Sequence, residues 1–410
     1  MKSLELFLAF RYLRGSRRTM GGGLTSAIAI AGVTVGVAAL IATLAVMTGF
    51  REDIRAKILG AQPHLLIQPP GNGTLPEADY KERFSSVKEV VAWSPFVLGQ
   101  ALVRSAQGAQ GVVVKGVDPA REAGVTGLDR RMIVGNWAEL GRPPAKGLAP
   151  PVFLGKELAA RLETGLGDRI VLAVSNGGDA GLGALPDLSA FTVAGILETG
   201  LYDYDSSLLV MGLGSAQNLF GLSGRLTGLG VRLEDADDFT GPAMKLQAKF
   251  SSLGFVRSWL ALNRPLFAAL RLEKIVMFLI LALITLVAAF TILSNLLLVT
   301  AQRTREIGIL GAMGATPGMI QRIFLLKGLL MGAFGTAAGT VLGLAISGLL
   351  KKYEFVKLPA DVYYVERLPV RVVPSDVLLV IVSALLIVLI ATLYPSRAAA
   401  RMDTLEAVRQ

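Results

Sequence analysis

The stretch from Ile275 to Gln302, IVMFLILALITLVAAFTILSNLLLVTAQ, contains no charged side chain and is long enough to cross a bilayer. A helix needs about 20 apolar residues to span a hydrocarbon core of about 30 Å. Three further uncharged stretches meet this criterion: Leu24–Phe50, Gly328–Leu350 and Val377–Ser396. Hydrophobic residues make up 52% of the 410-residue chain, against 18% for charged residues. The sequence therefore predicts a polytopic α-helical membrane protein with four transmembrane helices.

The first stretch, Leu24–Phe50, has a second interpretation as a cleaved secretory signal. The apolar core of a signal peptide is about 7 to 15 residues long. Because the apolar run up to Phe50 far exceeds that length, we expect an uncleaved anchor. In residues 1–23, Leu and Phe side chains alternate with Arg, which is typical of an amphipathic helix at the membrane surface.

The basic residues predict the orientation of the chain. The segment up to Gly23 has a net charge of +4, the segment 303–327 has +3, and the tail after Ser396 has +1. With four spans these three segments share one side of the membrane, and the positive-inside rule assigns that side to the cytoplasm. We therefore expect both termini in the cytoplasm and the block between the first two spans outside.

This block, residues 51–270, is predicted to be a large extracytoplasmic domain of mixed α/β structure inserted between helices 1 and 2. It has 22 basic and 22 acidic residues, so the net charge of +10 lies in the rest of the chain, and no nucleic-acid-binding patch is expected. Short apolar runs alternate with helical patterns. The predicted strands are His64–Gln68, Val97–Arg104, Gly111–Val117, Arg169–Val174, Phe191–Leu197 and Ser207–Met211. The predicted helices are Lys156–Glu163, Ser215–Phe220 and Ala236–Leu253.

Two segments of the block are predicted to be loops. Gly141–Pro151 is rich in Pro and Gly, and Ser175–Leu188 is rich in Gly. A long connection inside a compact domain is commonly either functional or disordered, so the second loop is a candidate binding segment.

The chain lacks the residues of several familiar kinds of site. There is no cysteine and only one histidine, His64, which excludes thiolate chemistry and disfavours a histidine-based metal site or triad. No G-x-x-x-x-G-K-[ST] phosphate loop occurs, and the four uncharged stretches contain no side chain suited to an ion relay. If this protein moves a substrate, the energy is expected to come from a partner.

Small residues recur at four-residue spacing in two of the spans. This spacing puts them on one helix face, where they let a neighbouring helix approach closely. They are Gly32 and Gly36 in the first span, and Gly335, Gly339, Gly343 and Ser347 in the third.

The segment Arg303–Pro317, RTREIGILGAMGATP, is predicted to form a short amphipathic helix between two spans. Ile309, Leu310 and Met313 share one helical face, and Thr316 is a good N-cap for the helix that follows. The pattern alone fits a turn at the membrane surface and a lever that docks in a partner's groove equally well.

Six phrases of the sequence, in order, resemble one known family. They are Phe10–Arg14, Val46–Phe50, Arg271–Lys274, Arg305–Thr316, Asp361–Pro369 and Thr392–Ala400. With them the chain resembles the lipoprotein-releasing ABC transporter permeases LolC and LolE, within the wider group of FtsX-like and MacB-like permeases. The resemblance covers nearly the whole chain.

The resemblance implies a translocation complex in the bacterial inner membrane. Two permease subunits would work with two copies of a separate, LolD-like ATPase, which binds ATP and Mg²⁺, while this chain holds no cofactor and no metal. The complex would extract lipoproteins from the outer leaflet and pass them to a LolA-like periplasmic carrier. A MacB-like export or mechanotransmission permease, or an FtsX-like regulator of cell-wall hydrolases, are the alternative interpretations. LolC-like, LolE-like and hybrid subunits stay open, as do a homodimer and a heterodimer.

The resemblance also divides the chain into segments. They are an N-terminal helix at 1–23, helix 1 at 24–50, a MacB-like periplasmic core domain at 51–270, helix 2 at 271–302, a coupling helix at 303–318, helix 3 at 319–350, a periplasmic loop at 351–376, helix 4 at 377–396 and a cytoplasmic tail at 397–410.

Three groups of site residues follow from the matching motifs. Those expected to line a lipid cavity are Met47, Phe50, Tyr363, Tyr364 and Leu368. Those expected to couple to the ATPase are Arg305, Glu306, Ile309, Leu310 and Met313. The 175–188 loop, with Leu182, Leu185 and Pro186, falls where one of the two permeases carries a hook for the carrier, although it contains no basic residue.

Overall fold

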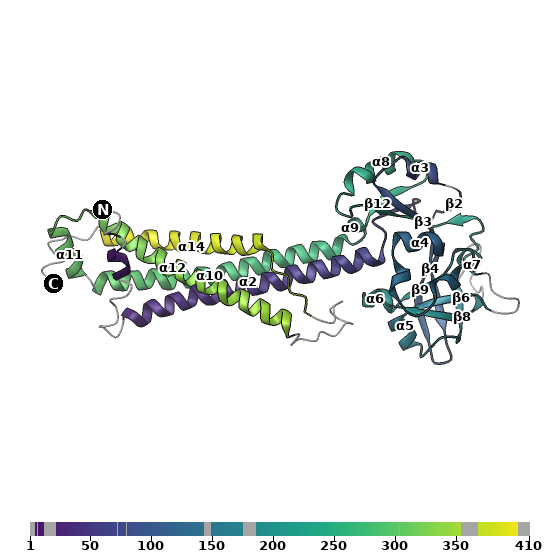
Figure 1. Cartoon of the computed structure of the whole chain (residues 1–410), viewed down its shortest axis with the longest axis horizontal. Coiled ribbons are helices and arrows are strands. Elements are labelled where there is room, and N and C mark those ends of the chain that lie inside the picture. Colours follow the sequence, from purple (N-terminus) through teal and green to yellow (C-terminus); the bar gives the residue numbers. More distant parts are fainter. Residues whose placement is uncertain are drawn as a thin grey trace. The chain divides into compact units, whose positions relative to one another are not determined.

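The computed structural model divides the chain into two units, which are described separately (Figure 1). The helical unit contains Met1–Arg51, Ala268–Lys357 and Arg367–Gln410, and the α/β unit is built on Glu52–Phe267. The residues that the structure describes are 5, 7–11, 22–71, 73–78, 80–142, 149–174, 186–302, 304–353 and 368–400.

Long apolar helices make up the helical unit. They are α2 (Gly22–Ala61), α10 (Arg264–Gln302), α12 (Pro317–Lys352) and α14 (Pro374–Ala400), with the short α11 (Thr304–Ala312) between α10 and α12. Within the described residues, these four long helices are each long and apolar enough to cross a membrane. The prediction of four transmembrane helices with an inserted α/β domain is confirmed.

Helix α2 continues well beyond Phe50, where the uncharged stretch ends. The continuation is amphipathic, because Ile54, Ile58 and Ala61 recur at helical spacing and are buried while charged residues separate them. Helix α10 likewise begins at Arg264, before the uncharged stretch that starts at Ile275. Hydropathy marked the apolar part of each helix and missed its polar extension.

The small residues of α12 pack where the sequence predicts. A Cβ added at Gly335 would lie 2.8 Å from Cβ of Val33, and one added at Gly339 would lie 2.7 Å from the carbonyl oxygen of Thr34. The Thr34 hydroxyl donates to the Gly335 carbonyl at 3.2 Å. Gly343 approaches α2 in the same way, so this stripe sets the contact between α12 and α2.

The α/β unit contains a closed barrel. Its strands pair in a ring in the order β3 (Val90–Arg104), β4 (Ala109–Val117), β9 (Leu208–Gly212), β6 (Pro151–Gly155), β8 (Asp187–Leu197) and β7 (Arg169–Val174), and β7 pairs back onto β3. The β4–β9 and β6–β8 pairs are parallel, and the other pairs of the ring are antiparallel.

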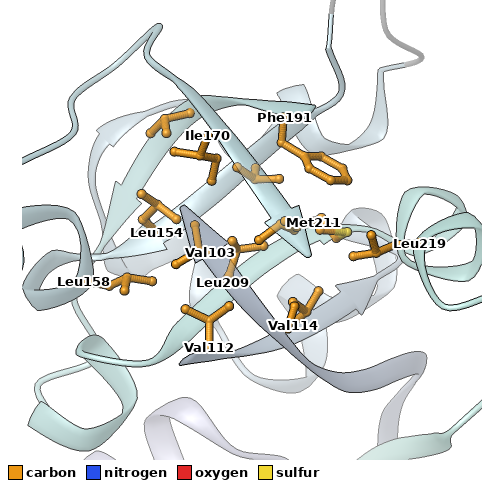
Figure 2. Close-up of a cluster of buried hydrophobic side chains, with 14 of the residues drawn as sticks. Val103, Val112, Val114, Leu154, Leu158, Ile170, Phe191, Leu209, Met211 and Leu219 are labelled. Carbon is orange, nitrogen blue, oxygen red and sulfur yellow. The ribbon is translucent and has the colours of Figure 1, made fainter. Parts of the chain in front are cut away.

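Alternating side chains fill this barrel. In β7 every second residue is buried, beginning at Ile170, which is the period of a strand with one face inward. Figure 2 shows the inward residues converging, among them Val103, Val112, Leu154, Ile170, Phe191 and Leu209. Leu158 of α5 (Lys156–Arg161) and Leu219 of α7 (Leu213–Leu219) pack against the same cluster.

The sheet extends beyond the barrel from the first half of β3. The added strands are β11 (Gly228–Leu233), β1 (Leu65–Gln68) and β12 (Phe255–Ser258). Helices α3 (Lys81–Ser85) and α8 (Thr240–Phe250) contribute to its core, in which the rings of Phe84 and Trp93 stack at 5.0 Å. The remaining elements are β2 (Leu75–Pro76), β5 (Met132–Gly135), β10 (Arg225–Leu226), α4 (Pro119–Val125), α6 (Tyr202–Asp205), α9 (Trp259–Leu262) and the 3-10 helices η2 (Leu128–Arg131) and η3 (Trp137–Gly141).

The two predicted loops differ from expectation at their ends. Pro151 opens β6, because the apolar run that follows it pairs on both sides. Asp187 opens β8 through pairing with Val174, so Asp187 and Leu188 are strand residues. The rest of the 175–188 segment up to Leu185 lies outside the described residues.

Candidate functional site

One candidate site lies in the helical unit, where the segment beginning at Leu368 runs along α2. The backbone N–H of Arg371 donates to the carbonyl oxygen of Ala45 at 2.9 Å. Gly49 is so close to Pro369 that a Cβ there would clash with the Pro369 carbonyl. These contacts bring the Leu368 segment against the stretch of α2 that carries Met47 and Phe50.

The exposure of these residues suits a lining role. Met47, Phe50 and Leu368 are all partly buried, so each packs on one side and leaves apolar surface on the other. Tyr363 and Tyr364, the other two expected lining residues, lie outside the described residues. The structure thus places Leu368 next to residues that contact the stretch of α2 carrying Met47 and Phe50.

Sequence reasoning missed a polar cluster beside this segment. Asp376, in the first turn of α14, accepts a hydrogen bond from the Thr48 hydroxyl at 3.0 Å. The Lys274 ammonium of α10 lies 3.3 Å from the same carboxylate. The cluster joins three helices. A sequence signal existed, because Lys274 and Asp376 each directly precede an uncharged stretch, at ends that the predicted topology places on the same side.

The segment 303–317 forms the expected short helix, with bounds Thr304–Ala312. Its buried face carries Ile307 and Gly308, whereas Ile309 is 47% exposed and Met313, just after the helix, is 80% exposed. Arg305 is also exposed, and Glu306 and Leu310 are partly buried. Ile309 and Met313 therefore form an apolar edge that is not covered by the described residues, and this exposure fits both a turn at the membrane surface and a lever that docks on a partner.

The turn into α12 is built as predicted. The Thr316 side chain accepts from the Met319 N–H, and Pro317 begins the helix. Gly314 has a φ of +92°, a conformation that favours glycine. At the same end of the unit, Glu5 of the N-terminal helical segment pairs with Arg322 at 3.6 Å.

Lys327 is a buried charged residue within a candidate span, whereas Arg322 of the same span is exposed. Lys327 precedes the uncharged stretch of α12 by one residue, but the candidate span begins at Pro317. Its side chain is 1% exposed. The expected helix 3 at 319–350 already includes Lys327, and only the uncharged stretch from Gly328 excludes it.

Few features of the α/β unit resemble a reactive site. His64, the lone histidine, is a core residue whose Nδ1 accepts from the Leu233 N–H at 3.2 Å, and burial together with Arg232 lowers its pKa. No group of three metal-binding side chains occurs among the described residues. Of the expected carrier-binding residues, Pro186 is exposed, whereas Leu182 and Leu185 lie outside the described part of the chain.

Comparisons with known proteins cover both units. Residues 26–247 match the MacB-like periplasmic core domain, and residues 278–404 match the FtsX-like permease C-terminal family. The chain is 34% identical to the lipoprotein-releasing system transmembrane protein LolC of Neisseria meningitidis, with 100% of both chains aligned. It is 30% identical to LolC of Xylella fastidiosa, with 99% of this chain and 98% of that protein aligned. It is 28% identical to LolE of Haemophilus influenzae, with 97% of each aligned.

Proposed function

Because the chain belongs to the family of lipoprotein-releasing system transmembrane proteins, we propose that it is the permease subunit of an ATP-driven complex that releases lipoproteins from the inner membrane. Similarity over the full length of LolC carries this proposal. It favours lipoprotein release over the MacB-like and FtsX-like alternatives, which share only the architecture.

The chemistry of the substrate defines what the permease must supply. Each buried CH₂ group is worth about 0.8 kcal/mol, so exposing two or three long acyl chains to water costs roughly 20 to 30 kcal/mol. A lipoprotein therefore does not leave the bilayer by itself at a useful rate. The permease must offer an apolar cavity for the chains and then close it with work supplied by ATP.

We assign the cavity wall to the region where the Leu368 segment meets α2. Met47 and Phe50 supply apolar surface, and the flexible thioether of Met47 adapts to chains of different shape. Tyr363, Tyr364 and Leu368 form the upper rim of the cavity in this proposal. The contacts of Pro369 and Arg371 with α2 support it, since they bring the chain next to Leu368 against the proposed wall.

We assign coupling to the apolar edge of α11 and the turn after it. Ile309 and Met313 enter a cleft on the ATPase, with Arg305, Glu306 and Leu310 beside them. When the ATPase closes, α11 moves α10 and α12, between which it lies in the chain. The exposure of Ile309 and Met313 supports this role.

The partners and location follow from the same proposal. Two LolD-like ATPase subunits bind ATP and Mg²⁺ in the cytoplasm, where both termini of this chain lie. A second permease subunit completes the membrane part. The α/β unit lies in the periplasm and meets a LolA-like carrier, with the segment around Pro186 as one contact.

Reconstitution tests the proposed function. The complex, purified with its ATPase and placed in proteoliposomes with a triacylated lipoprotein, should transfer that lipoprotein to soluble carrier only when ATP is added. A complex with an ATPase-dead partner is the control. Hydrolysis of ATP without any transfer of lipoprotein would contradict the proposal.

A further inference from the structure

A cavity of about 450 Å³ lies in the α/β unit, outside the barrel. Its lining side chains point away from the barrel interior. They lie where the barrel joins the sheet extension formed by β11, β1 and β12. This volume falls within the range of about 300 to 1,000 Å³ typical of small-ligand sites. We call it the wall cavity; its apolar lining includes Leu66, Phe96, Leu98, Val113, Leu208 and Leu262.

The wall cavity is open at its apolar side. Leu98 of β3 is 42% exposed, and Leu66, Val113 and Leu262 are partly buried. An apolar ligand that binds here would remove these side chains from water. Burial of apolar surface is favourable by about 25 cal/mol for each Å² removed from water. The lining thus favours a hydrocarbon ligand.

The polar lining is concentrated in one group of uncharged side chains. Gln62 donates from Nε2 to the Tyr204 hydroxyl, and Asn263 donates to Gln62 Oε1 at 3.1 Å. Burial raises the pKa of Tyr204, so its hydroxyl stays protonated and neutral. Such a group recognises a carbonyl or another uncharged dipole.

The lining contains one positive charge, and it is paired. The Lys115 ammonium lies 2.6 Å from the Glu122 carboxylate, and the Thr126 hydroxyl donates to the same carboxylate oxygen at 3.0 Å. Asp203 adds a further negative charge at the exposed rim. A ligand with an anionic end, such as a free fatty acid, therefore meets no surplus positive charge here.

Strand pairing argues against a peptide as the occupant. The lining strands β1, β11, β3, β4 and β9 each have a neighbour on both sides. An extended peptide that binds by strand addition needs an unpaired edge, and these strands offer none. An aliphatic chain forms no backbone hydrogen bonds, so it can bind without an unpaired strand edge.

The size of the wall cavity selects a single chain. At about 450 Å³ the cavity lies in the lower part of the range of about 300 to 1,000 Å³ for small-ligand sites. This volume suits one acyl chain better than a whole lipid anchor of two or three chains.

We propose that the wall cavity binds one acyl chain, with the ester or amide carbonyl of that chain at Tyr204. Identification of the chain as part of the lipoprotein cargo rests on the proposed function. The ends of the insert support this link, because Ala61, the last residue of α2, and Asn263, directly before α10, both line the cavity. The periplasmic unit would then shelter one chain while the others leave the membrane cavity.

Photocrosslinking tests this proposal on the full complex in lipid nanodiscs. The probe is a synthetic triacylated lipopeptide with a diazirine in one acyl chain, and labelled peptides are identified by mass spectrometry. We expect labelling at Phe96–Leu98, Val113 or Leu208. Leu98→Asp, which places a charge in the cavity, and Val113→Trp, which fills it, should each reduce this labelling at least tenfold.

Leu102→Asp is the matched control for Leu98→Asp. Leu102 lies on the same strand, is 48% exposed and does not line the cavity, so labelling of its variant should equal that of the wild type. The thermal unfolding of all variants shows whether each is folded. Loss of labelling in Leu102→Asp, or full labelling in both cavity variants, would overturn the proposal.

Two further outcomes separate the proposals from each other. Labelling confined to α2 and α10, with ATP-dependent release intact, overturns the wall-cavity proposal and leaves the proposed function standing. A phosphatidylethanolamine probe with the same diazirine distinguishes the source of the chain. If it labels the wall cavity as strongly as the lipopeptide does, the assignment to cargo is wrong. If neither release nor lipopeptide labelling occurs, the proposed function fails as well.

Discussion

The Lys274 ammonium lies 3.3 Å from the Asp376 carboxylate and ties the start of the apolar part of α10 to the first turn of α14. Thr48 adds α2 to this contact through its hydrogen bond to the same carboxylate. The pair is close to the Leu368 segment, so the cluster fixes three helices beside the expected lipid cavity.

Removal of the Asp376 carboxylate should loosen this end of the helical unit. A hydrogen bond to a charged group contributes about 1.5 to 3 kcal/mol. We expect Asp376→Ala to lower the apparent melting temperature of the detergent-solubilised protein more than Asp376→Asn, which keeps an acceptor for Thr48. Equal melting temperatures for the wild type and Asp376→Ala would show that the cluster does not hold the helices.

Gly339 should tolerate no larger side chain. A Cβ there would lie 2.7 Å from the Thr34 carbonyl oxygen, and backbone cannot move aside as a flexible side chain does. Overpacking of this kind costs about 1 to 3 kcal/mol. We expect Gly339→Leu to reduce the yield of folded protein in size-exclusion chromatography. Gly348→Leu, on the same helix with open space around it, serves as the control and should match the wild type.

The apolar edge at α11 should be needed for coupling and not for folding. Ile309→Lys combined with Met313→Lys places two charges on exposed positions, so the permease should still insert and assemble its helices. We expect stimulation of the ATPase by lipoprotein, and lipoprotein release, to fall at least tenfold. Glu306→Lys with Ile309→Lys should act in the same way.

A charge placed elsewhere on the same side provides the control for coupling. Gln302 is exposed at the end of α10, directly before the 303–318 segment, so Gln302→Lys should release lipoproteins at the wild-type rate. Normal release by the Ile309 and Met313 double variant would show that this edge does not dock on the ATPase.

Local patterns explain which elements the sequence could predict. Residues 170–174 form a short, continuous apolar run after Arg169, and β7 has the predicted bounds Arg169–Val174. β11 was not predicted because Gly228 and Gly230 interrupt its apolar run. At both positions an added Cβ would crowd neighbouring atoms, so glycine is needed there for the close packing of neighbouring residues and not for its strand propensity. Closure of the barrel by β7 on β3 depends on pairing between distant segments, which no local pattern encodes.

The same limit applies to the site. Motifs near single helices could suggest Met47, Phe50 and the α11 segment as site residues, because each motif is contiguous in the chain. The Thr48, Lys274 and Asp376 cluster combines residues separated by more than 100 positions, and only the packing of three helices brings them together. The wall cavity likewise collects its lining from five strands and several helices.

A charge in the expected lipid cavity should weaken substrate binding. We expect Met47→Asp, and separately Tyr363→Asp, to lower co-purification of lipoprotein at least fivefold, because a carboxylate next to acyl chains loses its hydration. Met47→Leu keeps the apolar surface and should bind as the wild type does. The amount of ATPase that co-purifies monitors assembly. Unchanged lipoprotein binding in Met47→Asp would show that Met47 does not line the lipid cavity and has only a structural role.

Acidification should destabilise the α/β unit through His64. Burial, with a smaller contribution from Arg232, lowers the pKa of His64 in the folded state, and Asp235 opposes this in part. The unfolded chain, with a histidine pKa of about 6.5, therefore binds a proton more readily than the folded chain. Stability is therefore unaffected by His64 well above a pH of about 6.5, and it falls as the pH drops below that value until the lowered pKa of the folded state is reached. The three tryptophans of the chain, Trp93, Trp137 and Trp259, all lie in the α/β unit, so their fluorescence during thermal unfolding reports on this unit alone. We expect the midpoint to fall on acidification in the wild type and to change less in His64→Gln; an equal fall in both would assign the pH dependence to other groups.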